Sequence, residues 1–147
     1  MKNKLKLSLP LKISQIANKI NQSLSKTLKE FDIAPEQRAI LYMIESESLI
    51  NQNELGFHLG KDKTTISRTL DVLEKKGYIL RKYAKNDKRS KIITLTSLGK
   101  EAVNVTQPSI QYFREAILYD ISYEEVEKFF ILLDKISLNI DRYNSEK

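Results

Sequence analysis

Apolar side chains recur at steps of three and four residues along the first part of the chain. Between residues 11 and 31 this spacing predicts one apolar stripe on a helix of about five turns, made of Ile13, Ile16, Ala17, Ile20, Leu24, Leu28 and Phe31. A second helix is predicted to start at Pro35, because proline is favoured at the first helical position. Residues 39–44 are apolar on nearly all sides, which predicts a central and buried helix.

Two shorter helices are predicted in the middle of the chain, separated by a tight turn. Asn51 and Glu54 have the spacing of a capping box, in which each side chain bonds the backbone N–H of the other residue. Only a short helix fits between this start and Gly60. Asp62 then begins a further helix that ends at Gly77, after two lysines. Its inner face is predicted to be Ile66, Thr69, Leu70 and Leu73.

The pattern changes from helix to strand after residue 77. Residues 78–83 and 91–95 are rich in β-branched and aromatic side chains, which predicts two strands. The stretch 84–90 between them is polar and basic and contains the turn-forming pair Asn86 and Asp87. We therefore expect a β-hairpin with a charged tip.

Two long helices are predicted to complete the chain. Thr96 is placed to cap the first of them, which Pro108 should kink or restart. Ser122 and Glu125 form a second capping box at the start of the last helix. The apolar side of that helix consists of Val126, Phe129, Phe130, Leu133, Ile136 and Ile140.

The order of these elements predicts a winged helix-turn-helix in a mainly α fold with a small β-hairpin wing, an α+β arrangement. The major groove of DNA admits one α-helix, whose N-terminal part meets the base edges. Short polar and cationic side chains occupy that part of the helix after Asp62, and we take them as candidate DNA contacts: Lys63, Thr64, Thr65, Ser67 and Arg68. Arg68 is the best candidate for bidentate recognition of guanine.

The hairpin tip is predicted to supply a second contact with DNA. Lys85, Lys88 and Arg89 project from a segment that can reach an adjacent minor groove, where narrow A·T-rich sequence attracts arginine. Asp87 is assigned a structural role in the wing. It forms either an Asx turn or a salt bridge, with Arg89 or Arg81 as the partner.

Positive charge is concentrated in the same part of the chain. The 147 residues carry a net charge of +6 at pH 7, whereas residues 61–91 alone hold 11 basic and 4 acidic side chains, a net +7. Charge by itself is also compatible with lysines that merely solvate a surface. Together with the helix-turn-helix pattern, the local basic patch indicates double-stranded DNA as the partner.

The composition excludes several other classes of function. Without cysteine there is no disulfide, thiolate zinc site, iron–sulfur cluster or thiol redox sensor. We expect the single histidine, His58, in the core or at its boundary rather than on a metal. A Gly-rich phosphate loop, a His-Glu metal motif and a nucleophile with a nearby base are all missing. We therefore predict that the protein is not an enzyme and uses no metal or cofactor.

The sequence also predicts a cytoplasmic protein with no membrane partner. Its longest unbroken apolar run, residues 39–44, is far shorter than the ~18 residues that span a bilayer. Pro10 and Lys12 interrupt any signal-peptide core at the N-terminus.

Four stretches of the central region resemble the MarR family of bacterial transcription factors. They are residues 55–68 (LGFHLGKDKTTISR), 73–78 (LEKKGY), 87–90 (DKRS) and 95–99 (LTSLG). The Asp-x-Arg of the wing followed by Leu-Thr-x-x-Gly is the most specific of these motifs. Three positions depart from the usual pattern: Gly56 replaces an alanine, Lys61 an apolar turn residue and Ala34 a threonine cap. None of these departures removes a predicted DNA contact.

The resemblance implies a homodimeric regulator, a repressor, that binds a pseudo-palindromic operator. It assigns residues 1–32 and 97–147 to a helical dimerisation region and residues 33–96 to the DNA-binding domain. By this resemblance, the family's base-reading positions correspond to Thr64, Thr65, Ser67 and Arg68. The arginine that contacts the minor groove corresponds to Arg89. A small phenolic or apolar acid is implied as the releasing effector. An aromatic set would either line its pocket or simply pack in the core and interface: Tyr112, Phe113, Tyr119, Phe129 and Phe130.

A winged domain that binds only other proteins is the main alternative. A protein interface usually contains apolar anchors, whereas the start of the predicted recognition helix is basic and rich in hydroxyl groups. Salt dependence separates the two functions, because each neutralised phosphate contributes about −0.9 to the log–log slope of DNA affinity against salt.

Overall fold

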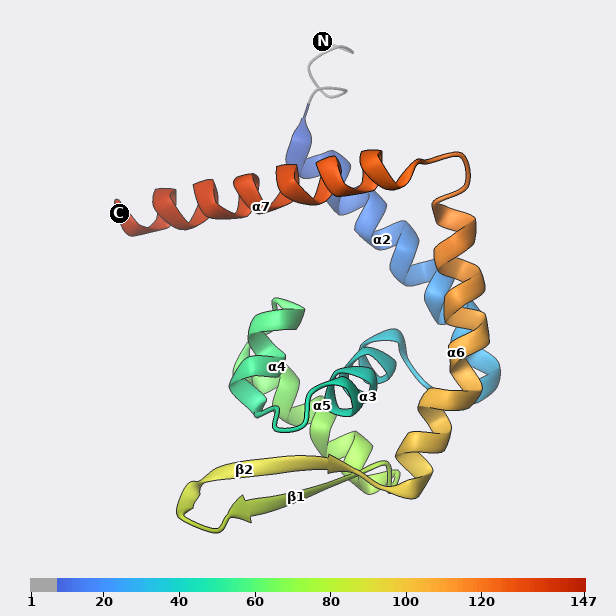
Figure 1. Ribbon diagram of the computed structural model, residues 1–147. Helices are drawn as coiled ribbons and strands as arrows, with labels where there is room; N and C mark the ends of the chain where they lie inside the picture. Colours follow the sequence, from blue (N-terminus) through green and yellow to red (C-terminus); the bar gives the residue numbers. More distant parts are fainter. Residues whose placement is uncertain (1–7) are drawn as a thin grey trace. The chain divides into compact units, whose positions relative to one another are not determined.

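The structure is a computed structural model that describes residues 8–147, with the side chains of residues 88–90 outside that description. The described chain contains six α-helices, a short 3₁₀-helix and one antiparallel hairpin (Figure 1). In chain order the elements are α2 (Leu9–Leu28), η1 (Lys29–Phe31), α3 (Pro35–Ser46), α4 (Gln52–Leu59), α5 (Lys63–Lys75), β1 (Ile79–Ala84), β2 (Asp87–Leu95), α6 (Ser97–Ile117) and α7 (Tyr123–Ser145).

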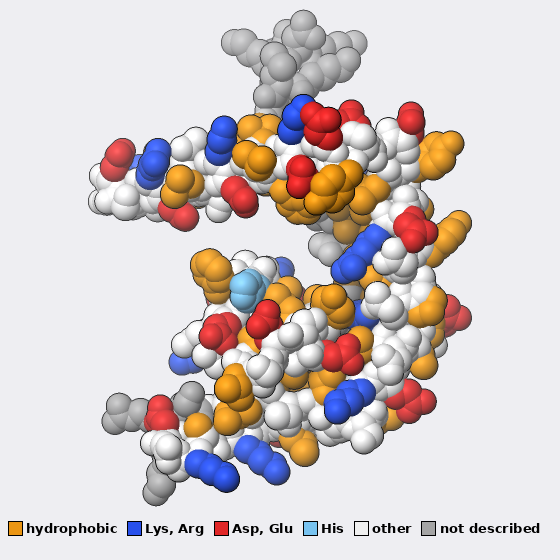
Figure 2. All heavy atoms as spheres, viewed as in Figure 1, with side chains coloured by type: hydrophobic (Ala, Val, Ile, Leu, Met, Phe, Trp, Pro, Cys, Tyr) orange, Lys and Arg blue, Asp and Glu red, His pale blue; other side chains and the backbone are white. Residues whose placement is uncertain are grey.

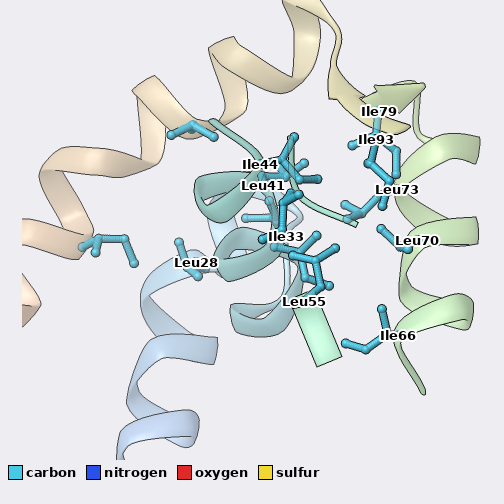
Figure 3. Close-up of a cluster of buried hydrophobic side chains, with 14 residues drawn as sticks. Leu28, Ile33, Leu41, Ile44, Leu55, Ile66, Leu70, Leu73, Ile79 and Ile93 are labelled. Carbon is cyan, nitrogen blue, oxygen red and sulfur yellow. The ribbon is translucent and has the colours of Figure 1, made fainter. Parts of the chain in front are cut away.

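Two compact units make up the chain, one that ends at Gln111 and one that runs from Tyr112 to Lys147. The core of the first unit is formed by α3, α4, α5 and the base of the hairpin, with the end of α2 and Val103 and Ile110 of α6 (Figure 3). Its fully buried side chains include Leu28, Ile40, Leu41, Leu55, Ile66, Leu70, Leu73 and Ile79. The predicted burial is confirmed for Ile40, Leu41 and Ile44 of α3 and for Ile66, Leu70 and Leu73 of α5. Thr69 of the predicted inner face is only half-buried, and Tyr42 on α3 is 39% exposed.

The helix starts that depend on local hydrogen bonds lie where the sequence predicted them. The Asn51 side chain accepts from the Glu54 N–H at 2.9 Å, and the Glu54 carboxylate accepts from the Asn51 N–H at 2.8 Å. In α3, which has no side-chain cap at Ala34, the Gln37 amide oxygen accepts from the Ala34 N–H at 3.2 Å. Gly60 ends α4 in the left-handed conformation, with φ of 61°.

The hairpin differs from its prediction at the tip. Ala84 pairs with Asp87, so only residues 85 and 86 form the turn, and β2 begins four residues earlier than expected. The register shifts between Tyr83 and Ala84, because Tyr83 pairs with Lys91. The prediction of a seven-residue loop at residues 84–90 was wrong. Polar and basic residues favour a loop, but here residues 87–90 are the irregular start of strand β2.

The α6 helix begins where the sequence predicts it. The Thr96 hydroxyl accepts from the Gly99 N–H at 3.1 Å and donates to the Gly77 carbonyl at 2.6 Å. Pro108 lies inside the helix, which does not restart there. A proline removes only one backbone donor from a helix, and the 21 residues of α6 retain the remaining turns.

A buried arginine that the sequence pattern did not reveal joins α3 to α6. Arg38 is only 4% exposed. Its Nε donates to Thr106 Oγ1 at 2.6 Å, and its Nη2 donates to Gln107 Oε1 at 2.6 Å. Because a buried guanidinium is costly unless its donors are satisfied, this contact links the helix-turn-helix region specifically to α6.

In the second unit, the apolar side of the long helix α7 is only partly buried, with Val126, Leu133 and Ile136 half-buried. Its start is the predicted capping box, in which the Ser122 N–H donates to Glu125 Oε2 at 2.8 Å. None of its residues is buried, and Phe129 and Phe130 are more than half exposed. Across the described residues, no helix has the length and apolar character that a membrane span requires.

Candidate nucleic-acid interface

The α5 helix begins with a cap that holds its first turn in place. Asp62 Oδ1 accepts from the Thr65 N–H at 2.8 Å, and Asp62 Oδ2 accepts from the Thr65 hydroxyl at 2.8 Å. These hydrogen bonds from Thr65 hold the pKa of the exposed Asp62 carboxyl below its usual value. The Thr65 hydroxyl proton is therefore engaged by the cap, so this side chain stabilises the helix start as well as facing the predicted interface.

The Asp62 cap makes folding stability depend on pH. A carboxyl whose pKa is lowered by folding stabilises the protein above its unfolded pKa, about 3.9, and this contribution disappears as pH falls through the lowered value. In the variant Asp62→Asn, the side-chain amide can still cap the helix but cannot titrate. We expect the thermal midpoint of the parent to exceed that of the variant near pH 6, with the difference shrinking as pH falls below the unfolded pKa of about 3.9. A difference that is constant across this range in a calorimetric pH series contradicts the assignment.

The same helix separates an apolar back from a polar front. Ile66, Leu70 and Leu73 are fully buried. On the front, Lys63, Thr64 and Arg68 are exposed, and Thr65 and Ser67 are half-buried. All five predicted contact residues thus lie on the first two turns, outside the core.

Two contacts with neighbouring helices fix the direction in which this front faces. The Thr69 hydroxyl donates to Glu36 Oε1 of α3 at 2.8 Å. The Gln52 side chain, at the start of α4, donates from Nε2 to the Lys63 carbonyl at 3.2 Å. The front of α5 is therefore held from both α3 and α4, and its backbone direction does not depend on the hydrophobic contacts alone.

Gln52 is a site residue that the sequence prediction missed. A cleft of about 350 Å³ is lined by Gln52 together with Lys63, Thr64, Ser67 and Arg68. The remaining capacity of a glutamine amide, an acceptor oxygen and a second N–H, suits a base edge or a phosphate. The sequence signal that could have identified Gln52 is its position as the first residue of α4, because the two helices of a helix-turn-helix meet across one short turn.

A second groove, of about 470 Å³, extends from Gln52 along the helix-turn-helix turn to Phe57 and Lys63. Phe57 is 84% exposed. His58 is also exposed, with its ring edge-on to Phe57 at 5.6 Å, so the prediction of core or boundary packing for His58 was wrong. The helix α4 is only eight residues long and uses Leu55 as its buried contact, which leaves its next turn at the surface.

The wing carries further positive charge (Figure 2). Lys85 is exposed in the turn, and Lys91 Nζ lies 5.4 Å from the centre of the Tyr83 ring. The side chains of Lys88 and Arg89 lie outside the described residues, so their predicted roles stay predictions. The same holds for the structural role of Asp87, which pairs with Ala84 through the backbone.

The part of this surface that the structure describes lacks the character of a metal centre. The described residues include no group of three or more His, Asp or Glu side chains that could hold an ion. The available groups are hydroxyls, amides, ammonium groups and guanidinium groups on one protruding helix and one hairpin. These groups donate hydrogen bonds to phosphates and base edges.

Comparison with known proteins decides the family. The model of the MarR family matches residues 33–91. Uncharacterised HTH-type transcriptional regulators of Bacillus cereus and Bacillus anthracis are 30% identical to this chain over 137 residues, which cover 93% of this chain and 89% of theirs. The chain belongs to the MarR family. As a MarR-family protein it is a DNA-binding transcriptional regulator, and the predicted winged-helix fold is confirmed.

Solved structures of MarR-family proteins have the same fold. A MarR/EmrR family regulator from Acinetobacter sp. ADP1 matches 90% of this chain and 94% of its own with a TM-score of 0.83 and 29% identity. The S. aureus MepR–DNA complex covers 90% of this chain and 98% of its own with a TM-score of 0.82 and 25% identity. The match to a mutant E. coli MarR bound to operator DNA covers 88% of this chain and 94% of the E. coli chain, with a TM-score of 0.79 and 27% identity.

Proposed function

We propose that this MarR-family protein is a sequence-specific repressor that binds a pseudo-palindromic operator as a homodimer. The observation that carries the proposal is the front of α5, where Lys63, Thr64, Ser67 and Arg68 line one cleft with Gln52 while the back of the helix is buried. Two of the structural neighbours were solved with DNA. Half-sites about one helical turn apart, ~10 bp, fit two such helices related by a two-fold axis.

Each side chain then has a role that follows from its chemistry. Arg68 reads a guanine through its two parallel N–H groups, and Thr64, Thr65 and Ser67 contact phosphates or base edges. Lys63 and Lys85 contact phosphates. Lys88 and Arg89 enter the adjacent minor groove, where Arg89 is attracted by the negative potential of narrow A·T-rich sequence.

The exposed apolar side chains support the homodimer. Leu9, Ile13 and Ile16 on α2 are each 40–50% exposed, although they belong to the stripe whose other end, Leu28, is buried. On α7 no residue of the predicted apolar side is buried, and Phe129, Phe130 and Ile140 are more than half exposed. Apolar faces of this length on two helices are typical of a protein interface, and a second copy is the partner that a two-fold operator requires.

A cavity in the first unit supports release by a small molecule. It has a volume of about 220 Å³ and is lined by Phe31, Ile33, Tyr78, Leu98, Glu101, Ala102, Val105 and Thr106. A cavity of about 150 Å³ can hold one aromatic ring. The Glu101 carboxylate favours a phenol over an acid. The aromatic residues 112, 113, 119, 129 and 130 do not line this cavity, and the tyrosines among them are more than three-quarters exposed.

Selection from random-sequence duplexes tests the function directly. Several rounds of selection with the purified protein should enrich an inverted repeat, and DNA footprinting should protect both halves. Affinity should fall steeply between 50 and 200 mM salt, since each phosphate contact contributes about −0.9 to the log–log slope. Absence of enrichment with a flat salt dependence would instead favour a protein-interaction module.

The variant Arg68→Ala tests the base-reading helix. We expect discrimination between the selected operator and single-base variants at one position to fall by ~1–3 kcal/mol, because the bidentate hydrogen bonds to guanine are removed. Lys75→Ala, near the end of the same helix, removes the same charge and should weaken binding to all sequences equally. If Arg68→Ala ranks the operator variants in the same order and with the same spacing as the parent, the base-reading role of Arg68 is wrong.

A further inference from the structure

A branched ion pair connects the wing to the recognition helix. Arg81, in β1, donates from Nε to Glu74 Oε2 at 2.8 Å and from Nη2 to Asp71 Oδ1 at 2.5 Å. Both acceptors belong to α5. The Arg81 side chain is 15% exposed, while those of Asp71 and Glu74 are 62% and 42% exposed. A planar guanidinium that bonds two carboxylates in different directions fixes orientation as well as distance.

The pair lies where the hairpin leaves the body of the domain. Arg81 shares its face of β1 with Ile79, which is fully buried, and it is paired across the hairpin with Ile93, which is also buried. The next residue on that face, Tyr83, is 62% exposed. Among the described side chains of β1, Arg81 is therefore the one nearest the hairpin tip that hydrogen-bonds to α5. It sets the direction in which the wing projects.

The two carboxylates also border the DNA-contacting part of α5. Ser67, Asp71 and Glu74 follow one another at steps of four and three residues, so they form one row on the helix surface. Acidic groups in this row repel a phosphate backbone unless a cation is held against them. The hydrogen bonds that Arg81 donates to the Glu74 and Asp71 carboxylates raise the pKa of Arg81, so the guanidinium remains charged.

We propose that Arg81 is a positioning residue for DNA binding, which holds the wing at the angle to α5 that lets both elements enter their grooves together. This inference rests on the proposed DNA-binding function and assigns it a residue that itself contacts no base. Without the pair, α5 still enters the major groove, but the wing no longer reaches the minor groove at the same time.

The double variant Asp71→Ala/Glu74→Ala gives an expectation opposite to that of charge alone. It removes two negative charges from exposed helix positions where alanine is well tolerated. Charge alone predicts tighter binding and a steeper salt dependence. Loss of positioning predicts about tenfold weaker binding to the selected operator, with a salt slope shallower by about 1 for each phosphate that the wing no longer reaches. Glu45→Ala/Glu47→Ala, exposed on the same unit, is the matched charge control.

Dimethyl sulfate footprinting reads the two grooves separately, through guanine N7 in the major groove and adenine N3 in the minor groove. For Asp71→Ala/Glu74→Ala and for Arg81→Met we expect minor-groove protection to disappear and major-groove protection to remain. Arg81→Lys, which keeps the charge and can reach one carboxylate, should restore part of the minor-groove protection. The control variant should protect both grooves as the parent does.

The outcomes separate this inference from the function on which it rests. A parent protein that selects no DNA sequence overturns both. A parent that protects both grooves, together with an Asp71→Ala/Glu74→Ala variant that also protects both and binds more tightly, overturns the positioning role of Arg81 alone. Thermal melts identify which variants fold. If Arg81→Met does not fold, the Asp71→Ala/Glu74→Ala variant still tests the proposal, because its two substitutions are at exposed positions.

Discussion

Replacing Leu133 with aspartate should convert the protein from dimers to monomers and weaken operator binding at least about 100-fold. Leu133 lies on the apolar side of α7, whose residues are not buried within the chain. A charge at that position has to be desolvated when a second copy covers it. Two linked recognition helices bind far more tightly than one, because the second contact becomes intramolecular and gains a factor of about 10²–10⁴. Sedimentation velocity and operator titration measure the two effects.

The control for this variant is Asn139→Asp, which lies away from the apolar side of the same helix. It introduces the same charge at an exposed position and should leave both mass and operator affinity unchanged. A Leu133→Asp protein that sediments as an intact dimer contradicts the assignment of α7 to the interface. Circular dichroism identifies a variant that has lost its helices rather than its partner.

The second large effect is expected at Gly99, where helix propensity and packing make opposite predictions. Gly99 lies in the first turn of α6, and alanine at a helical glycine normally stabilises by about 1 kcal/mol. A Cβ at this position, however, would lie 2.1 Å from the Tyr78 carbonyl oxygen. A backbone oxygen cannot rotate away as a side chain can, so we expect Gly99→Ala to lower the free energy of unfolding by about 3 kcal/mol, the upper end of the usual overpacking cost.

Gly56→Ala provides the comparison for Gly99→Ala. Gly56 is also helical, but its added Cβ would approach the Lys61 carbonyl oxygen to only 3.0 Å, a contact that a shift of a few tenths of an ångström relieves. The free energy of unfolding should therefore change by less than about 1 kcal/mol. Urea denaturation of both variants measures the difference. If Gly99→Ala is as stable as the parent, α6 does not pack as closely against residue 78 as described.

Those parts of the fold that depend on neighbouring residues were predictable from the sequence. The capping boxes at Asn51 and Ser122 each use a partner three residues away, and the stop at Gly77 depends on its own backbone conformation. The front of α5 follows from the helical period, which places Arg68 opposite Ile66 and Leu70 once the helix start at Asp62 is known. Each of these interactions is decided within about two helical turns.

The errors concern features that distant residues decide. His58 was assigned to the core from its place beside Leu59, but burial in an eight-residue helix depends on which neighbours pack against it. The hairpin tip was predicted as a loop because its residues are polar, whereas strand pairing is decided by the opposite strand. The local pattern left open whether Pro108 kinks or restarts α6, and the structure excludes the restart.

The sequence by itself determined the order of elements, the cationic front of α5 and the membership in the MarR family, because these properties depend on side-chain type and short-range spacing. Only the tertiary structure decided that Gln52 joins the cleft of Arg68, that Arg38 is buried against Thr106, and that Arg81 bonds Asp71 and Glu74. Lysine, arginine and glutamine side chains are long and carry several donors. Their partners are selected by where other helices and strands bring acceptors within about 3 Å, and no periodicity along the chain encodes that choice.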